Sequence, residues 1–459
     1  MTSPVRRAGA FAAVGSLVLL LPAVGPEAAM TVAAAVLVGA AVVTDGPLFE
    51  LFARPGDRKE QRLFGLIGFG LAVVGLGLLT VTDLVGTGRV PPLQVDVFVG
   101  TVLLLVYGNL ASELVKTRYP NPFHVSAGFV AGGITAGIAG QLVARVLLDQ
   151  PLAGTLPKVV FLAVSGAFLG ALLRAALFER DDPLVLFSVG LLLWLLFELA
   201  PAVHNQEIAA ALGVTLVLGY LSFALQTASV EGMLTGVLLS ILTIVLGGIG
   251  WFTVLISFFA IGALSTKYRY DTKAARGIAE DNEGARGTGN VLGNAAVAIV
   301  AVLGFAAADP GVALLRVDGT IFLFAFAGSI ATALSDTLSS EIGAVFDSPR
   351  LITTLQPVEP GTDGAVTWQG ELAGIVGATV VATISFLVFP ALDGSVTVST
   401  TGAGVVLVAG IGGMTVDSLL GATLEGDFLG NQGVNFFATL AGAVVAVLVA
   451  FVVGGATLP

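Results

Sequence analysis

Long apolar runs recur from one end of the chain to the other, and they constrain the fold more than any other feature. They extend over about 18 to 22 residues, the length that a helix needs to cross a bilayer. Only 11% of the residues are charged, against about 25% in soluble proteins. Runs such as LVLFSVGLLLWLLFELA lack the period-two alternation of a membrane β-barrel. The sequence therefore predicts an all-α, polytopic transmembrane helical bundle.

We expect fifteen spans and a cytoplasmic N-terminus. With that orientation, sixteen basic residues fall in cytoplasmic segments and four fall outside, as the positive-inside rule requires. We therefore expect an integral protein of the cell membrane whose polar motifs face the cytoplasm. The predicted spans are residues 8–25, 28–48, 63–82, 93–113, 125–148, 157–178, 183–201, 208–226, 230–246, 248–264, 291–308, 318–337, 370–390, 401–420 and 433–454.

The motif LSDTLSSEIG, residues 334–343, places charge at the end of one of these runs. Carboxylates near the membrane edge are costly when unpaired, so Asp336 and Glu341 mark a functional site, with an interhelical salt bridge as the alternative. Thr337 shares a helix face with Ser340 and Glu341. In a regular helix Asp336 and Glu341 point about 140° apart. Both can therefore bind one metal ion only if the helix ends or bends there.

Three more polar segments are expected at the same membrane face. Residues 265–295 supply basic and amide groups, and residues 347–374 have the turn formers typical of a loop that folds over a ligand. In TVDSLLGATLEGDFLGNQGVN, Asp417 and Glu425 lie about two turns apart, and Gly421 lets a backbone or a ligand approach closely. The candidate binding residues of these segments are Lys267, Lys273, Arg286, Asn290, Asn294, Arg350, Thr353, Thr354, Asp363, Ser418 and Asn435.

Together these groups favour phosphoryl or nucleotidyl transfer onto a lipid substrate. Hard oxygen ligands suit Mg²⁺, which bridges phosphates, and Lys and Arg offset the remaining phosphate charge. The chain has no cysteine, which excludes disulfides and thiolate metal sites. His124 and His204 are isolated in the sequence, and we interpret both as structural.

At these motifs the chain resembles the phytyl-phosphate kinase-like family of integral membrane proteins, distant relatives of phytol and dolichol kinases. The resemblance covers roughly residues 208–455 and rests on the motifs NVLGN, DTLSSEIG, PRLITT, PGTDG and DSLLGATLE. Two positions depart from the family pattern. Asn290 stands where the family usually has Gln, and Ala285 replaces an Arg.

This resemblance implies transfer of a phosphoryl group from CTP, or from another nucleoside triphosphate such as ATP, to an isoprenyl monophosphate. It implies that Asp336, Glu341 and Asp417 are catalytic and that these three and Glu425 hold Mg²⁺ or orient the acceptor phosphate. Lys267, Lys273, Arg286 and Arg350 would then hold the triphosphate. The expected partners are a membrane lipid or isoprenoid and a nucleotide, and no nucleic acid.

We divide the chain into an N-terminal membrane domain, residues 1–205, and the kinase-like membrane domain, residues 206–459. Leu110-Ala-Ser-Glu-Leu114 matches Leu338-Ser-Ser-Glu-Ile342, and Gly128 and Gly132 match Gly370 and Gly374. Two explanations of these matches stay open: a parallel duplication, and chance in an Ala/Gly-rich chain. A parallel duplication would put Gly108 in the place of Asp336. The first domain would then be a non-catalytic copy that scaffolds the second or receives lipid.

Two other functions stay open at this point. A CTP-dependent cytidylyltransferase, or a kinase acting on another lipid, would share the nucleotide, the metal and the cytoplasmic face. A transporter would also suit fifteen spans with intramembrane polar groups. The phosphoryl donor, the isoprenoid chain length and the oligomeric state are not determined by the sequence.

Overall fold

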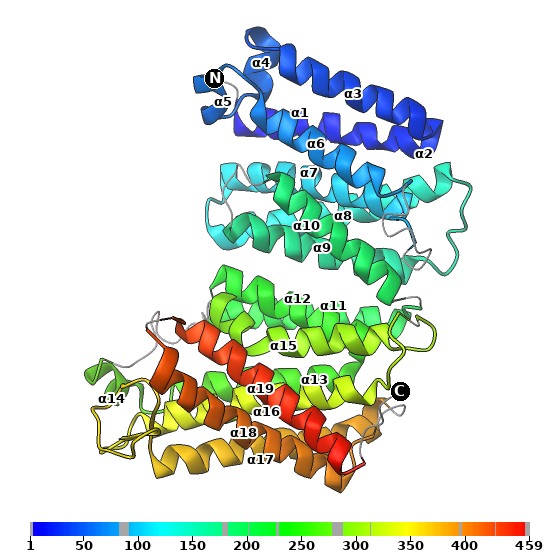
Figure 1. Ribbon diagram of the computed structural model, residues 1–459. Helices are drawn as coiled ribbons and strands as arrows, with labels where there is room; N and C mark the ends of the chain where they lie inside the picture. The colour runs from blue at the N-terminus through cyan, green and yellow to red at the C-terminus, as the bar shows by residue number, and fades with distance from the viewer. Residues whose placement is uncertain are drawn as a thin grey trace. The chain divides into compact units, whose positions relative to one another are not determined.

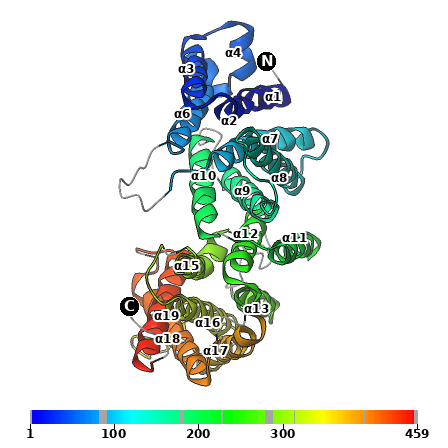
Figure 2. The same cartoon turned by 90° about the vertical axis from the view of Figure 1, so that its right-hand side faces the viewer.

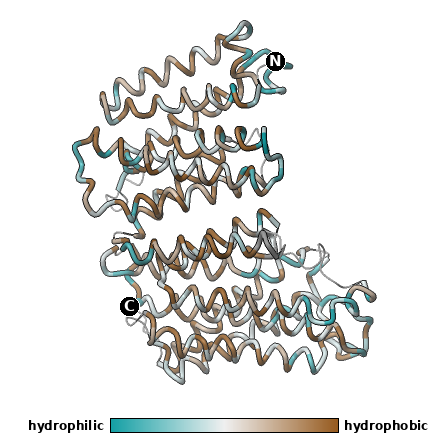
Figure 3. Tube along the Cα trace, turned by 180° about the vertical axis from the view of Figure 1, so that it is seen from behind, coloured by the Kyte–Doolittle hydropathy of each residue, from teal (hydrophilic) through white to brown (hydrophobic). Residues whose placement is uncertain are grey.

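The computed structural model describes residues 3–81, 91–176, 182–200, 202–225, 229–277, 288–312, 314–393, 397–426 and 428–454. Almost all of this is helix, which confirms the predicted all-α class. The chain forms two compact units, residues 1–208 and residues 209–459, and each is described here by itself. Figure 3 shows hydrophobic residues along the helices and hydrophilic residues concentrated at their ends and in the loops.

The first unit is a bundle built around two long paired helices, α7 and α8 (Figure 1). The short 3₁₀ turn η1, Ser16–Leu19, joins α1 to α2. Its helices are α1 (Pro4–Gly15), α2 (Leu20–Val24), α3 (Pro26–Val42), α4 (Gly46–Phe52), α5 (Pro55–Glu60), α6 (Phe64–Leu78), α7 (Val95–Arg118), α8 (Pro122–Leu147), α9 (Leu156–Ala176) and α10 (Asp182–Leu199).

The second unit surrounds one central helix, α16, with five others, and Figure 2 shows α13 and α15–α19 grouped together. Between α16 and α17 the strands β1 (Arg350–Leu351) and β2 (Ala365–Val366) pair antiparallel, with Arg350 opposite Val366. The helices are α11 (Asn205–Leu225, which begins at the end of the first unit), α12 (Val230–Gly247), α13 (Ile249–Thr266), α14 (Tyr270–Ala275), α15 (Thr288–Ala307), α16 (Thr320–Gly343), α17 (Trp368–Val388), α18 (Thr400–Leu424) and α19 (Asn431–Val452).

A helix lies on every one of the fifteen predicted spans, but not all of them are straight or long. Ten helical stretches of the described residues have the length and hydropathy of a membrane span. The apolar stretches Phe64–Leu78, Pro183–Leu199 and Val291–Ala307 are shorter. The predicted span over residues 28–48 is not one straight helix, because α3 and α4 meet there at 104°. Asp45 and Gly46, with a positive φ of 81° at the glycine, form that corner.

An aromatic cluster and close contacts at small residues hold the second unit together. The ring of Trp251 lies 4.6 Å from that of Phe305 and 4.7 Å from that of Phe326, measured between centroids. On α17, a Cβ placed on Gly370 would lie 2.7 Å from the carbonyl oxygen of Ser339, so only a glycine fits against α16. Such small-residue contacts are how membrane helices pack when lipid supplies no hydrophobic driving force between them.

The same contacts occur between α7 and α8 of the first unit, which supports the predicted duplication. There a Cβ on Gly128 would lie 3.4 Å from the oxygen of Ala111, the residue that the motif match pairs with Ser339. One turn further, a Cβ on Gly132 would lie 3.1 Å from the oxygen of Tyr107, just as one on Gly374 would lie 3.0 Å from that of Ser335.

Candidate functional site

A polar cavity of about 480 Å³ lies in the second unit, at the end of α16 that carries the LSDTLSSEIG motif. That volume is within the range of small-molecule sites, about 300 to 1,000 Å³. The walls come from α14, α15, α16, α18, α19 and the segment between α16 and α17. Eleven of the predicted site residues line it: Lys273, Asn294, Asp336, Thr337, Ser340, Glu341, Asp363, Asp417, Ser418, Glu425 and Asn435.

Asp336 and Asp417 face each other because their helices meet one turn earlier. Thr332 of α16 occupies the space that a side chain on Gly413 of α18 would need, and its hydroxyl also donates to the oxygen of Ala409, 3.3 Å away. Each aspartate follows its contact residue by four positions, about one helical turn. Each therefore lies on nearly the face of its helix that contacts the other helix. Both carboxyl groups line the cavity, where they are neighbours. Oδ1 of Asp417 is buried and has no hydrogen-bond partner in the described residues.

Glu341 is committed to a different partner, the ammonium group of Lys273. Lys273 comes from α14, which folds back after a left-handed turn at Arg269 with φ of 46°. The Lys273 side chain is only 2% exposed, and it also donates to the carbonyl oxygen of Thr266, 2.7 Å away. Because α16 runs unbroken to Gly343, Asp336 and Glu341 do not converge on one ion. Glu341 is thus an ion-pair partner in this structure, and the condition for its sharing a metal ion with Asp336, a bend or an end of the helix between them, is not met.

The segment between α16 and α17 closes one side of the cavity through a contact between two glycines. Gly364, with a φ of 71°, lies against α18 so closely that a Cβ there would lie 2.5 Å from the oxygen of Ser418. A Cβ on Gly421 would meet the Gly364 nitrogen at 2.9 Å. The prediction that Gly421 admits another backbone is confirmed. This contact places the neighbouring Asp363 beside the cavity.

Four predicted binding residues do not line the cavity. Arg350 is exposed, and its Nη1 donates to the oxygen of Leu355 at 2.6 Å, which holds it inside its own turn. The side chains of Thr353, Thr354 and Lys267 are exposed outside the cavity. Arg286 and the side chain of Asn290 lie outside the described residues.

Sequence reasoning missed several polar lining residues that the loops and helix ends contribute. Ser339, which the helical period puts on the same face as Asp336, also lines the cavity but was not among the predicted binding residues. Thr367, whose hydroxyl oxygen accepts from the Gly370 nitrogen at 3.1 Å, caps α17, and Asn431 starts α19. Neither position had a signal in the sequence beyond its polar type.

The cavity is strongly acidic for its size. Five carboxylates line it, those of Asp336, Glu341, Asp363, Asp417 and Glu425, against one ammonium group, that of Lys273. Burial, followed by the charges of Asp363 and Asp336, raises the pKa of Glu425 above its usual value. Negative charge in excess is a physical reason for this cavity to attract cations.

The residues present suit Mg²⁺ shared with a phosphate better than a metal held by protein alone. In the described residues no three Asp, Glu, His or Cys side chains gather closely enough to hold an ion by themselves. Mg²⁺ is usually bound through one or two carboxylates, with water and substrate phosphates completing the shell. Asp336 and the unpartnered Oδ1 of Asp417 match that requirement.

Comparison with known proteins places the second unit in a family. Residues 213–443 match the integral membrane proteins described as DUF92. The chain is 34% identical over 225 residues to an uncharacterised membrane protein of Methanocaldococcus jannaschii, which covers 48% of this chain and 84% of the relative. It is also 34% identical over 209 residues to an uncharacterised membrane protein of Synechocystis. That match covers 44% of this chain and 76% of the relative.

A plant relative is similar over a comparable length. The chloroplastic protein VTE6 of Arabidopsis thaliana is 30% identical over 229 residues, 48% of this chain and 64% of the relative. No solved structure matches the chain.

Proposed function

Because the chain belongs to the DUF92 family of integral membrane proteins, we propose that its second unit is a Mg²⁺-dependent kinase. It transfers the γ-phosphoryl group of CTP, or of another nucleoside triphosphate, to an isoprenyl monophosphate. The observation that carries this proposal is the pair Asp336 and Asp417, with the unpartnered Oδ1 of Asp417, in a polar cavity at the end of apolar helices. The choice of acceptor rests on the resemblance at the DTLSSEIG and DSLLGATLE motifs.

A phosphate acceptor suits this set of side chains because it needs no strong base. The second pKa of a phosphate monoester is about 6, so its oxygens are already largely ionised near neutral pH. An alcohol acceptor would have to lose a proton during the transfer. No histidine is among the described residues that line the cavity.

The reaction balances without an oxidant or a general base. An oxygen of the acceptor phosphate forms a bond to the γ-phosphorus, and the bond from that phosphorus to the β–γ bridging oxygen breaks. The nucleoside diphosphate leaves with the electron pair. Mg²⁺, when bound, would neutralise the charge that develops on the phosphoryl oxygens. Catalysis of this kind is mainly positioning and electrostatic stabilisation.

The chain's own residues then have distinct roles. Asp336 and Asp417, which line the cavity, would hold the cation through their carboxylate oxygens. The amides of Asn294 and Asn435 and the hydroxyl of Ser418 can donate hydrogen bonds to phosphate oxygens. Lys273 acts indirectly, because its ammonium group anchors Glu341 and the end of α16 to α14. Gly364 keeps the loop against α18 and so restricts the cavity on that side.

The test uses purified full-length protein, Mg²⁺, geranylgeranyl monophosphate and CTP or ATP labelled in either the α- or the γ-phosphate. We expect the γ-label in geranylgeranyl diphosphate and no transfer of the α-label. Asp336→Asn and Asp417→Asn should each lower the rate by at least about 10²-fold, as loss of a key electrostatic group does. Asp271→Asn removes the same kind of group from an exposed position on α14 and is the matched control.

The two labels also separate the proposal from its competitors. Incorporation of the α-label would identify a cytidylyltransferase or nucleotidyltransferase instead. Cooperative unfolding on heating would show that the purified protein is folded. If such protein transferred neither label to any prenyl monophosphate, the kinase proposal would be refuted.

A further inference from the structure

Two helices of the second unit, α15 and α19, begin side by side at the acidic cavity. Gln432, the second residue of α19, lies against the first turns of α15. Its side chain fills the place of a Cβ on Gly289, and a Cβ on Gly293 would lie 2.9 Å from its backbone oxygen. Because Gly289 is the second residue of α15, the amino ends of the two helices are neighbours. Each end carries backbone N–H donors and the positive end of a helix dipole.

Three side-chain amides line the cavity near these helix ends. Asn294 comes from α15, and Asn431 and Asn435 come from α19, where they are one turn apart on one face. Each amide has N–H donors and carries no charge. Four of the five carboxylates that line the cavity come instead from α16 and from the end of α18. Carboxylates and amides therefore lie on separate walls of one cavity.

The first turn of α19 has donors that the protein itself does not use. It follows Gly430, which has no side chain to cap the helix, and it has no acidic residue. In the described part of the chain, no acceptor is bonded to the backbone N–H groups of Asn431 and Gln432. The start of α17, which also reaches the cavity, differs because the Thr367 hydroxyl caps it. Uncapped donors at a helix end are met by water or by a ligand.

An independent observation on another wall of the cavity also indicates a ligand. Oδ1 of Asp417 is buried and has no partner among the described residues. A carboxylate oxygen in this state suits a cation, whereas an uncapped helix end suits an anion. Mg²⁺ bound to a phosphate group satisfies both, because the ion takes oxygen ligands from protein and phosphate together.

We propose that the amino ends of α15 and α19, with the amides of Asn431 and Asn435, form a phosphate subsite. A phosphate bound there shares its cation with Asp336 and Asp417 on the neighbouring helices. The proposal rests on the proposed function only in taking this phosphate from a substrate of the transfer. The recognised group is the same in the nucleotide and in the isoprenyl monophosphate, and the binding experiment distinguishes the two sources.

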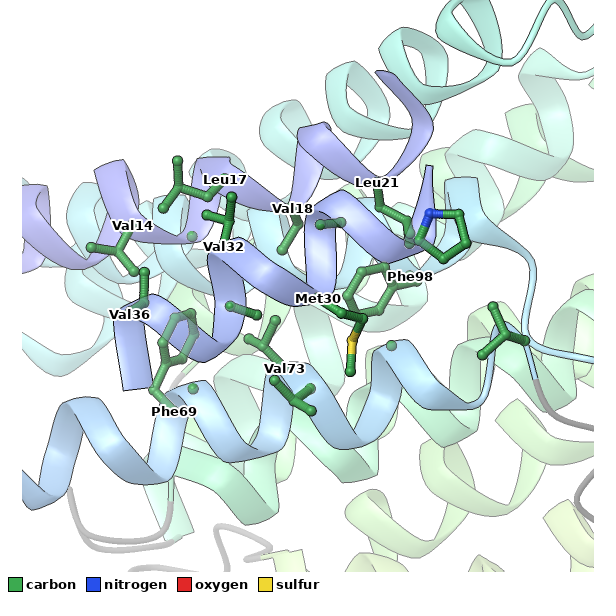
Figure 4. Close-up of a pocket in the computed structure, with 18 residues that line it drawn as sticks. Val14, Leu17, Val18, Leu21, Met30, Val32, Val36, Phe69, Val73 and Phe98 are labelled. Atoms are coloured by element: carbon green, nitrogen blue, oxygen red, sulfur yellow. The ribbon is translucent and has the colours of Figure 1, made fainter. Parts of the chain in front are cut away.

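The apolar pocket of the first unit, shown in Figure 4, has no comparable groups. Its labelled side chains are hydrocarbon or thioether, as at Val14, Met30 and Phe69, and no polar side chain lines it. It offers neither donors to a phosphate nor oxygen ligands to a cation. This pocket therefore does not compete for a phosphate ligand.

Asn431→Asp and Asn435→Asp test the subsite by replacing an amide with a carboxylate of nearly the same shape. An acidic residue at the first position of a helix is stabilising, so Asn431→Asp should not unfold α19. Equilibrium binding to full-length protein in detergent with Mg²⁺ is measured for labelled CTP alone and for tritiated geranylgeranyl monophosphate alone. At least one ligand should bind about tenfold or more weakly in each variant, because hydrogen bonds to phosphate are replaced by repulsion. The ligand that weakens identifies the source of the phosphate.

Gln356→Glu is the matched control, since it makes the same chemical change at an exposed position outside the cavity. It should leave both affinities unchanged. Normal binding of both ligands in Asn431→Asp and Asn435→Asp would overturn the proposal. So would a wild-type protein that binds neither ligand.

Binding of Mn²⁺ alone, followed by electron paramagnetic resonance, tests the carboxylate wall separately. Asn431→Asp and Asn435→Asp should bind Mn²⁺ at least as tightly as the wild type, because each adds negative charge. Asp336→Asn combined with Asp417→Asn should weaken Mn²⁺ binding by about tenfold or more. An equal loss of Mn²⁺ and of phosphate in the Asn variants would show general damage to the cavity and would overturn a separate phosphate subsite.

These measurements do not depend on kinase activity, because neither ligand alone can undergo the transfer. Phosphate binding that requires Asn431 and Asn435, in protein that transfers no label, would establish the subsite and refute the kinase. Transfer of the γ-label, with normal binding of both ligands in the two variants, would do the reverse.

Discussion

Thr332 of α16 occupies the space that a side chain on Gly413 of α18 would need, one turn before Asp336 and Asp417. The interval between the two carboxylates is therefore set by a helix contact and not by the site itself. This contact explains how two carboxylates from different helices can be brought together without a rigid loop to hold them. It also makes the geometry of the site sensitive to a residue that touches no substrate.

Gly413→Val should wedge α16 and α18 apart and separate Asp336 from Asp417. Overpacking typically costs about 1 to 3 kcal/mol, and a displacement of about 1 Å at the chemistry can cost about 10²-fold in rate. The measurements are the thermal unfolding midpoint and the rate of γ-label transfer. Gly412→Val is the control, since a Cβ there meets only Val445 at an ordinary 3.7 Å. Equal rates in the two variants would show that the helix contact does not position the carboxylates.

Replacing Lys273 by Met should destabilise the second unit by about 3 to 5 kcal/mol, because the Glu341 carboxylate would lose its buried partner. The double variant Lys273→Met, Glu341→Leu should recover much of that stability, since no unpaired charge is left. Chemical or thermal unfolding in detergent measures both. Arg276→Met is the comparison. It removes an ion pair with the exposed Asp347 and hydrogen bonds to the backbone oxygens of Ala344 and Phe346, and it should cost less because it leaves no buried charge unpaired. If the double variant were no more stable than Lys273→Met, the stability of the unit would not depend on the pairing of Lys273 with Glu341.

The stability of metal-free protein should fall as pH rises above about 4.5, partly through Glu425. Its pKa is raised by burial and by Asp363 and Asp336, so the folded state binds the proton more tightly than the unfolded state does. Stability from this group is present below the unfolded pKa and is lost as pH rises through the folded pKa. Glu425→Gln should flatten the decline of the unfolding midpoint with pH, measured in EDTA. Glu359→Gln, at an exposed position outside the cavity, is the matched control, and an equal flattening there would refute the assignment.

The helical class and the polar face could be predicted because they follow from local patterns. Apolar runs of membrane length specify helices, and the motif residues of α16 and α18 lie at the ends of those runs. The predicted duplication rests on short sequence matches, and the contacts of Gly128 and Gly370 agree with it. These features depend on residues that are close in sequence or repeated within it.

The partners of individual side chains could not be predicted, because they depend on how distant segments meet. The pairing of Lys273 with Glu341 requires the left-handed turn at Arg269, which no residue type there signals. Arg350 was expected to hold triphosphate, but a tight local turn directs it to the oxygen of Leu355. The corner between α3 and α4 occurs within a run apolar enough for one straight span.

The cysteine-free chain allows the predicted cytoplasmic orientation of the cavity to be tested directly. Thr353→Cys places a thiol on the exposed segment between α16 and α17, and Asp309→Cys places one on the exposed segment at the other end of α16. In intact cells a membrane-impermeant maleimide should label the Asp309 variant and not the Thr353 variant, and lysis should make the second accessible. The expectation follows from the excess of basic residues on the same side as residue 353. The reverse labelling pattern would place the cavity outside the cell, away from cytoplasmic nucleotide, and would also argue against the kinase.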